Sequence, residues 1–150
     1  MITLTEHPID MEQVTESVRS PAAGAVVLFL GTVREFTHGT QTRFLEYSAY
    51  PAMALAQLQE LRQEAVSRFH LVGASVVHRT GRLELGEVSV AVAVSAAHRA
   101  EAFAAGQWLM DELKRRVPIW KKEHYVDGRE EWQHPGVTGA GEVSAGGGTG

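Results

Sequence analysis

An α+β fold, with helices packed on a mixed or antiparallel sheet, is predicted by three features of the sequence. The chain has 150 residues, the size of one ordinary domain. Two long segments repeat apolar residues at helical spacing, and a third alternates valine with small residues as a strand does. These segments follow one another irregularly, without an internal repeat, which favours a layered α+β arrangement over a doubly wound one.

The first elements are expected to be a short strand, a short helix and a second strand. Residues 2–6 alternate between apolar and polar side chains, which is typical of a strand. Asp10 is a suitable N-cap, with Gln13 at the capping-box position, for a helix that ends near residue 19. The run 24–31 is apolar without alternation and short for a helix, so we expect a strand that is buried on both faces.

The centre of the chain is expected to hold a loop, a strand and a long helix. Residues 35–42 are polar and include a glycine, which indicates a loop, and a strand is expected at 44–47. Pro51 suits the first turn of a helix. Apolar residues then recur at helical spacing and predict a helix over about 50–69; they are Ala54, Leu58, Leu61, Ala65 and Phe69.

Two further strands are expected at about 72–79 and 87–95, joined by a turn-rich connection over 80–86. In the second of them, valines alternate with small residues. The valine face requires a core, and the small-residue face allows close packing by a helix or a partner sheet. A helix is then expected over 98–116, with a buried stripe formed by Phe103, Gly106, Met110, Leu113 and Val117.

Pro118 ends this helix, and a strand is expected from 119 to 126, before a turn at Asp127. Beyond the turn, the composition changes to a Gly-rich segment that is predicted to be disordered. The sequence therefore predicts one domain over residues 1–135 and a tail over 136–150.

The composition narrows the possible functions. The chain contains no cysteine, which excludes a disulfide framework, a thiolate metal site and a cysteine nucleophile. Any sulfur chemistry must therefore use sulfur that another molecule brings. The formal net charge of -4 argues against a general nucleic-acid binder. No apolar run approaches the length of a membrane span, and the N-terminus lacks the features of a signal peptide, so the cytoplasm is the expected location.

Two segments contain residues that can bind an anion. Arg34 follows a buried strand at the start of a polar loop, where its guanidinium can grip a phosphate or carboxylate, or simply be solvated. His98 and Arg99 lie where a strand becomes a helix, and backbone N–H groups at a helix start attract anions. In the alternative interpretation, Glu101 and solvent offset these two cations.

Two lysines are candidates for acid–base or nucleophilic chemistry. Lys114 is in the last helical turn and Lys121 is on the strand after Pro118, so the helix end can bring both amines to one cleft. Two close ammonium groups lower each other's pKa, and burial lowers it further, which can tune a lysine for catalysis. The alternative is structural, because lysines near a helix C-terminus interact with its dipole and Asp111 can pair with Lys114 or Arg115.

The remaining residues indicate no further chemistry. Trp120 can stack on a ring-shaped ligand or face a partner, although aromatic residues in strands more often belong to the core. The histidines show no metal-ligand spacing, so a histidine metal site is not expected. No cofactor is expected either. The sequence contains no nucleophile elbow, P-loop or Rossmann fingerprint.

Taken in order, six segments resemble the large, catalytic subunit of molybdopterin synthase. They have the order and spacing of that family and span roughly residues 2–133. The segments are Gly24–Arg34, Leu45–Met53, Val77–Leu83, Ser95–Arg99, Ala102–Lys114 and Val117–Glu123. The resemblance implies an α/β-hammerhead-like fold with a smaller β subdomain. It also implies a sulfurtransferase of molybdenum cofactor biosynthesis, which forms the dithiolene of molybdopterin from cyclic pyranopterin monophosphate.

In this family the sulfur comes from a small ubiquitin-like carrier, whose C-terminal Gly-Gly ends in a thiocarboxylate. The resemblance therefore implies such a partner, together with a homodimer of large subunits within a heterotetramer that has one carrier at each end. The missing cysteine is consistent with sulfur that arrives on a partner. The Gly-rich tail departs from the more polar, charged tail of many relatives, which leaves the role of residues past about 135 open.

By position, the resemblance gives two lysines central catalytic roles, with Lys114 beside the carrier's terminal carbonyl and Lys121 beside the substrate. His98 and Arg99 are expected to reach the anionic part of the substrate from the other subunit. The full implied set of substrate-binding residues is Thr32, Val33, Arg34, His98, Arg99, Lys114, Lys121, Lys122 and Glu123. The implied pocket walls are Phe29 and Met110.

Two other functions remain open from the residues alone. One is a non-catalytic dimeric scaffold that binds an anionic ligand or a small protein. The other is a nucleic-acid module built on a basic cluster, which the net negative charge disfavours. That cluster consists of Arg115, Arg116, Lys121 and Lys122.

Overall fold

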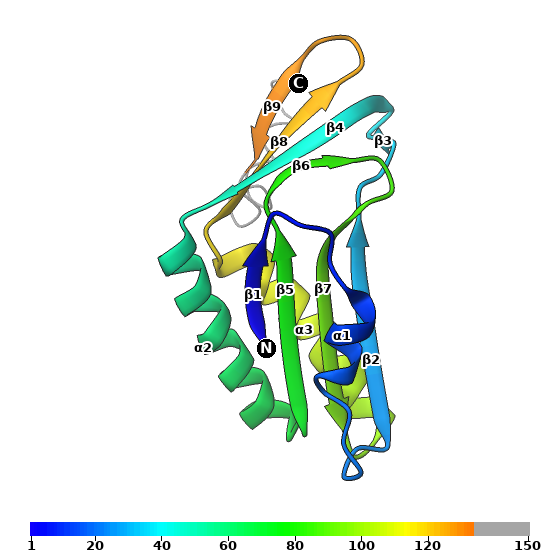
Figure 1. The fold of residues 1–150 in the computed structure, drawn as a ribbon, viewed down its shortest axis with the longest axis vertical. Helices are drawn as coiled ribbons and strands as arrows, with labels where there is room; N and C mark the ends of the chain where they lie inside the picture. The colour runs from blue at the N-terminus through cyan, green and yellow to red at the C-terminus, as the bar shows by residue number, and fades with distance from the viewer. Residues whose placement is uncertain (134–150) are drawn as a thin grey trace.

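The computed structural model describes residues 1–133 of the chain (Figure 1). The predicted tail over 136–150, and with it the predicted domain boundary at 135, lies outside the described residues. In chain order the elements are β1 (Ile2–Thr5), α1 (Met11–Glu16), β2 (Ala25–Thr32), β3 (Phe36–Thr37), β4 (Thr40–Ala49), α2 (Pro51–Phe69), β5 (Gly73–Arg79), β6 (Gly81–Glu84), β7 (Val88–Ala96), α3 (Arg99–Arg116), β8 (Ile119–Tyr125) and β9 (Glu130–Gln133).

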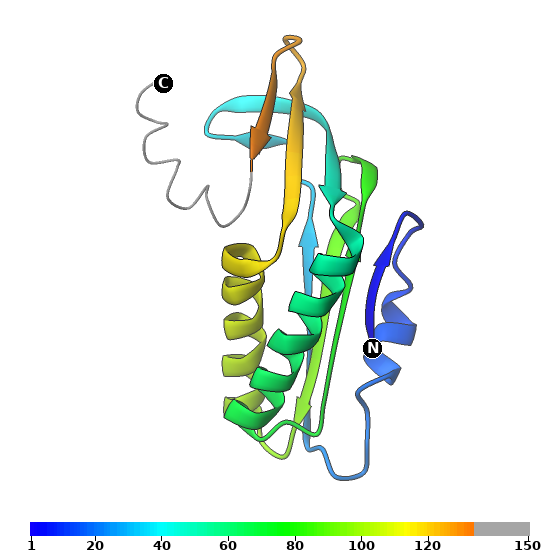
Figure 2. The ribbon, with the colours of Figure 1, turned by 90° about the vertical axis from the view of Figure 1, so that its left-hand side faces the viewer.

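A sheet with the strand order β1-β5-β7-β2 forms the body of the molecule. The pairing of β1 with β5 is parallel and the other two pairings are antiparallel, so this sheet is mixed. Helices α2 and α3 lie side by side on one face of the sheet, and the short helix α1 lies on the other face (Figure 2). The arrangement is the layered α+β fold that the sequence predicts.

β7 is buried on both faces because helices cover both sides of the sheet. Val90 and Val92 belong to the main core, which β7 shares with α2 and α3. Ala91 and Ala93 belong to a second cluster, which includes Val14 of α1. The valine face therefore meets a core and the small-residue face meets a closely packed helix, as the alternation in the sequence predicts.

A second, antiparallel sheet lies at one end of the first and forms the smaller β part of the fold (Figure 1). Its strand order is β3-β4-β8-β9, and β6 also pairs with β4. After α3, which ends at Arg116, two residues before Pro118, the chain passes directly into β8 of this sheet. The helix end and the second sheet are therefore neighbours, which is the arrangement that the candidate site requires.

Three short strands lie where the sequence predicts loops or no structure. β3 and the start of β4 fall within the predicted loop 35–42, and β6 falls within the predicted connection 80–86. β9 pairs with β8 beyond the turn at Asp127, where no strand is expected. These strands are short and largely polar, so their pairing depends on partners elsewhere in the chain rather than on a local pattern.

Two predictions about burial are wrong. β2 is the edge strand of its sheet rather than an inner strand, and Val26 and Phe29 are 39% and 41% exposed. Phe103, which the sequence places in the buried stripe of the last helix, is 64% exposed. The other members of that stripe are buried: Gly106, Met110, Leu113 and Val117. Phe29 and Phe103 thus leave exposed apolar surface on β2 and α3, two elements that contact each other.

Leu109→Ala is expected to lower the free energy of unfolding by about 3 kcal/mol, because truncation of a core leucine leaves a cavity. Leu109 is 1% exposed and lies in the main core. Gln107→Ala, at an exposed position of the same helix, is the matched control and should change the free energy by less than about 0.5 kcal/mol. Urea denaturation measures both, and equal losses would contradict this placement of the core.

Candidate active site

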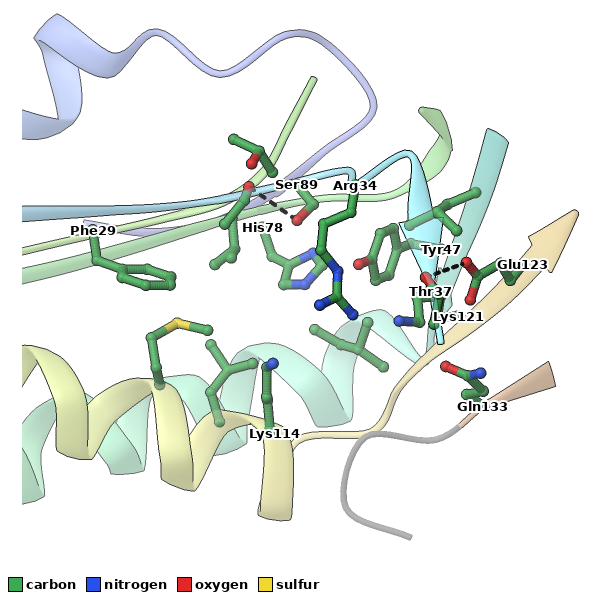
Figure 3. Close-up of a pocket in the computed structure, with 17 residues that line it drawn as sticks. Phe29, Arg34, Thr37, Tyr47, His78, Ser89, Lys114, Lys121, Glu123 and Gln133 are labelled. Atoms are coloured by element: carbon green, nitrogen blue, oxygen red, sulfur yellow. Dashed lines mark hydrogen bonds between the residues drawn. The ribbon is translucent and has the colours of Figure 1, made fainter. Parts of the chain in front are cut away.

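A cavity of about 480 Å³ lies where the C-terminal end of α3 meets the two sheets. Its wall is formed by the end of β2, by α3 and by residues of β3, β4, β5, β7, β8 and β9 (Figure 3). A volume of this size is typical of a site for a small molecule.

The register of the strands explains why these wall residues converge. In the second sheet, Tyr47 pairs with Lys121, and Lys121 pairs on its other side with Gln133. In the first sheet, His78 pairs with Val90 in the same way. Side chains directly opposite one another on neighbouring strands share one face of a sheet. The paired residues of each sheet therefore point together toward the cavity.

Three cationic side chains line the cavity, and they come from three different elements (Figure 3). Arg34 follows β2, Lys114 is in the last turn of α3, and Lys121 is on β8. Burial lowers the pKa of the Lys121 amine, and the charges of Lys114 and Arg34 lower it further, whereas the charge of Glu123 opposes the shift. The helix end and the following strand therefore bring both amines to one cleft, as predicted from the break at Pro118.

The ion-pair half of the structural alternative for Lys114 finds no support in the described part of the chain, but Lys114 does lie in the last turn of α3, where its charge suits the helix dipole. Within residues 1–133, Lys114 forms no ion pair, and Arg115 pairs with Glu112 at 2.5 Å rather than with Asp111. Lys114 is exposed, whereas Lys121 is only partly exposed. The two amines thus have different environments within the same cavity.

Glu123 is the buried acid of the site, with 2% of its surface exposed. Its Oε2 accepts hydrogen bonds from the hydroxyls of Thr37, at 2.9 Å, and of Thr42. Its Oε1 has no hydrogen-bond partner among the described residues. A buried carboxylate oxygen without a donor is unfavourable, so Oε1 is a natural acceptor for a ligand N–H or O–H group.

Five uncharged polar residues that sequence reasoning did not assign also line the wall: Thr37, Tyr47, His78, Ser89 and Gln133. The Nδ1 of His78 donates to the carbonyl oxygen of Arg79 at 2.8 Å, and burial lowers the pKa of the imidazole to about 4. Burial also raises the pKa of Tyr47. The one sequence signal for His78 is its place in the segment Val77–Leu83, which forms part of the family resemblance.

Most of the residues predicted for the site line this cavity: Phe29, Thr32, Arg34, Met110, Lys114, Lys121 and Glu123. Val33 does not, because its side chain is buried in a small hydrophobic cluster with Leu45 and Leu83. Lys122 does not either, because successive side chains of a strand point to opposite faces. Its ammonium group instead forms an ion pair with Glu130 at 3.0 Å.

His98 and Arg99 lie at the far end of α3 from Lys114, and both are exposed. At the helical rise per residue, about 24 Å of helix separate His98 from Lys114. Neither residue lines the cavity of this chain. Their predicted contribution from another subunit therefore stays a prediction.

The described residues bear on three other kinds of site: an aromatic stacking site, a metal site and a membrane-spanning helix. Trp120 is partly exposed and lies edge-on to Tyr50, with 5.1 Å between the ring centroids, outside the cavity wall. Residues 1–133 contain no group of three or more His, Asp or Glu side chains placed to hold a metal ion. Among the same residues, no helix combines the length and the apolar character needed to cross a membrane.

The family model described as MoaE protein matches residues 4–116 of the chain. The chain belongs to the MoaE protein family. A curated relative of this MoaE chain, the molybdopterin synthase catalytic subunit of Halalkalibacterium halodurans, is 45% identical to it over 129 residues. That match covers 86% of the chain and 82% of the relative.

Solved structures agree with this assignment. Molybdopterin synthase from Staphylococcus aureus superposes on the MoaE chain with a TM-score of 0.82 and 40% identity, over 87% of this chain and 94% of that one. A complex of subunits 1 and 2 of molybdopterin-converting factor from Helicobacter pylori shares the fold, with a TM-score of 0.70 and 18% identity, over 85% of this chain and 87% of that one. The predicted family, enzyme class and α+β fold are confirmed.

The amine of Lys121 is expected to titrate below the ordinary lysine value. Lys114→Met removes a nearby charge but keeps the length of the side chain, so the pKa of Lys121 should rise. Glu123→Gln removes the opposing charge, so the pKa of Lys121 should fall further. NMR titration of isotope-labelled lysine measures both shifts. A Lys121 pKa that is unchanged in both variants would contradict a shared cavity.

Proposed function

We propose that this chain is the catalytic subunit of a molybdopterin synthase, which moves sulfur from a protein carrier onto cyclic pyranopterin monophosphate. The observation that carries the proposal is the convergence of Arg34, Lys114 and Lys121 on one cavity in a protein without cysteine. Cationic groups suit both an anionic substrate and an anionic sulfur donor. The product would be the dithiolene of molybdopterin, and the cytoplasm is the proposed place of the reaction.

The substrate is proposed to lie with its phosphate toward the cations and its ring between apolar walls. The guanidinium of Arg34 can bind a phosphate with two hydrogen bonds. Phe29 and Met110 supply apolar surface on the wall, and Thr32 supplies a hydroxyl. The unpartnered Oε1 of Glu123 can accept a hydrogen bond from a donor on the substrate. The cavity volume of about 480 Å³ suits a molecule of this size.

The carrier is proposed to deliver its sulfur along the exposed side of the cavity. Lys114 is exposed, so an extended Gly-Gly tail can bring its terminal carbonyl beside this amine. Lys121 is more buried and would lie beside the pterin. In the Helicobacter pylori structure, subunits 1 and 2 of molybdopterin-converting factor form a complex. We propose a corresponding small partner for this chain.

The proposed chemistry follows from the positions of the two amines. The thiocarboxylate sulfur attacks a side-chain carbon of the pterin, a C–S bond forms, and the displaced oxygen leaves after it gains a proton. The lowered pKa of Lys121 lets its ammonium group supply that proton at neutral pH. Water then cleaves the acyl–sulfur bond, which leaves the sulfur on the pterin and a carboxylate on the carrier. A second carrier repeats the cycle.

A second copy of the chain is proposed to pair along β2 and α3. These elements contact each other and expose the apolar side chains Phe29 and Phe103. β2 is also an edge strand, and the unpaired backbone groups of an edge favour pairing with another chain. Such a dimer would let His98 and Arg99 of one copy approach the cavity of the other. One carrier on each large subunit would complete a heterotetramer.

Reconstitution tests the proposed function. The chain, mixed with a ubiquitin-like protein that ends in Gly-Gly, should form a complex on size-exclusion chromatography. With the thiocarboxylated carrier and cyclic pyranopterin monophosphate, this complex should form molybdopterin, and a carrier without its terminal Gly-Gly should not support the reaction. A complex without product would favour a non-catalytic scaffold, and the absence of both would contradict the proposal.

A further inference from the structure

His78 is a buried, titratable side chain of the cavity wall to which the proposed chemistry gives no role. It lies near the end of β5, an inner strand of the first sheet, and it is 4% exposed. Figure 3 shows its ring among Ser89, Arg34 and Tyr47, on the sheet side of the cavity and across from Lys114 on α3. A polar ring in this position can contact a ligand that binds in the cavity.

The hydrogen bond of His78 fixes the position of its proton. Nδ1 lies 2.8 Å from the carbonyl oxygen of Arg79, and a carbonyl oxygen can only accept. Nδ1 must therefore carry the proton, and in the neutral ring Nε2 carries a lone pair. Burial lowers the pKa of the imidazole to about 4, so the ring is neutral at physiological pH. The wall thus presents an acceptor at this point, not a cation.

The neighbours of His78 hold the ring in this orientation. The Tyr47 ring packs against it at an interplanar angle of 71°, with 5.0 Å between centroids. The Ser89 hydroxyl donates to the carbonyl oxygen of Gly31 at 3.2 Å. Within residues 1–133, the structure records no hydrogen bond to Nε2 of His78. The acceptor is therefore oriented by its surroundings and available to a ligand.

A pterin monophosphate has two chemically different parts. Its phosphate offers only acceptors, which suit the cations Arg34, Lys114 and Lys121. Its ring carries N–H donors, which a cation cannot bind but a neutral imidazole nitrogen can. We propose that His78 orients the substrate by accepting a hydrogen bond at Nε2 from an N–H group of the pterin ring. This inference rests on the proposed function, because it assumes a pterin in the cavity.

Two substitutions separate the acceptor from the shape of the ring. His78→Phe keeps a flat ring against Tyr47 but removes both nitrogens. His78→Gln places an amide oxygen near the position of Nε2 and so restores an acceptor. With saturating thiocarboxylated carrier, His78→Phe should raise KM for cyclic pyranopterin monophosphate about tenfold, the loss expected for one hydrogen bond, and change kcat less than threefold. His78→Gln should return KM to within about threefold of the original value.

Two controls exclude indirect explanations. Val76→Ala, at a core position of the same strand with 1% exposure, lowers stability without touching the cavity and should leave KM unchanged. Inhibition by inorganic phosphate reports on the three cations Arg34, Lys114 and Lys121, so its inhibition constant should be the same in His78→Phe and in the original chain. A parallel loss of phosphate affinity would mean that His78 acts by positioning these cations, and this result would overturn the inference.

The remaining outcomes separate the inference from the proposed function. An unchanged KM in His78→Phe, or equal losses in His78→Phe and His78→Gln, would overturn the inference alone. If the original chain makes no product with thiocarboxylated carrier, the proposed function fails. The role of His78 is then decided by fluorescence titration with cyclic pyranopterin monophosphate itself. About tenfold weaker binding by His78→Phe supports the role, and equal affinity or no binding by the original chain rejects it.

Discussion

Lys114→Ala is expected to slow molybdopterin formation by about a thousandfold, a larger loss than we expect from Lys121→Ala. Lys114 is exposed at the end of α3 and lines the cavity. Its ammonium group is proposed to lie beside the carrier's terminal carbonyl, where negative charge develops during sulfur transfer. Removal of one such charge-stabilising donor from an active site typically reduces kcat by about a hundred- to a thousandfold. A single-turnover assay with thiocarboxylated carrier measures the effect.

Lys122→Ala is the matched control for this substitution. Lys122 is also a lysine near the site, but its ammonium group pairs with Glu130 and does not line the cavity. Its removal should change the rate less than about threefold, since a partly exposed ion pair outside the cavity contributes little. Wild-type activity in Lys114→Ala would contradict the role of Lys114. Equal losses in both variants would indicate a general need for positive charge instead.

Lys121→Ala is expected to reduce the rate about a hundredfold, within the range for loss of a general acid–base group. Burial and the nearby charges of Lys114 and Arg34 lower the pKa of this amine, which suits it for proton transfer at neutral pH. Lys121→Arg keeps the positive charge, but its guanidinium stays protonated at this pH and so is a poor general acid–base group. It should therefore bind the anionic substrate and still fail to restore the rate.

The comparison of Lys121→Arg with Lys121→Ala separates proton transfer from charge. Measured kcat and KM should show a low kcat in both variants, with the higher KM in Lys121→Ala. Carrier affinity, measured by calorimetry, should stay unchanged, because Lys121 is proposed to lie beside the pterin rather than beside the carrier's tail. Full recovery of kcat by arginine would show that charge alone is required and would contradict the proton-transfer role.

The sequence predicted the elements that local patterns determine. The apolar spacing of α2 and α3, the alternation of β7 and the Asp10 cap all appear in the structure, where the Asp10 carboxylate accepts from the Gln13 backbone N–H at 3.1 Å. β3, β6 and β9 were missed because short polar strands form only when a distant partner is present. The exposure of Phe103 was missed because apolar residues also occur on protein surfaces, so an apolar residue type alone does not show that a position is buried.

The candidate site also contains residues whose positions could be predicted from the sequence and residues whose positions could not. The cleft with Lys114 and Lys121 could be predicted, because Pro118 forces the chain to turn between them. The hydrogen bonds of Glu123 could not, because its two threonine partners lie 86 and 81 residues away in sequence. The neutral acceptor at His78 depends on burial and on one carbonyl oxygen, neither of which a single sequence displays. The position of a side chain beside a helix end can thus be predicted from the sequence. The position of a side chain that depends on the pairing of distant strands cannot.

The sulfur content of the pterin product decides whether this chain transfers sulfur from the carrier to the substrate. The chain is incubated with cyclic pyranopterin monophosphate and excess thiocarboxylated carrier. The masses of the pterin and of the carrier are then measured by mass spectrometry. We expect a pterin that has gained two sulfur atoms, with two carriers converted from thiocarboxylate to carboxylate for each pterin. A pterin without sulfur, beside a carrier that keeps its thiocarboxylate or loses it only to water, would contradict the proposed sulfur transfer.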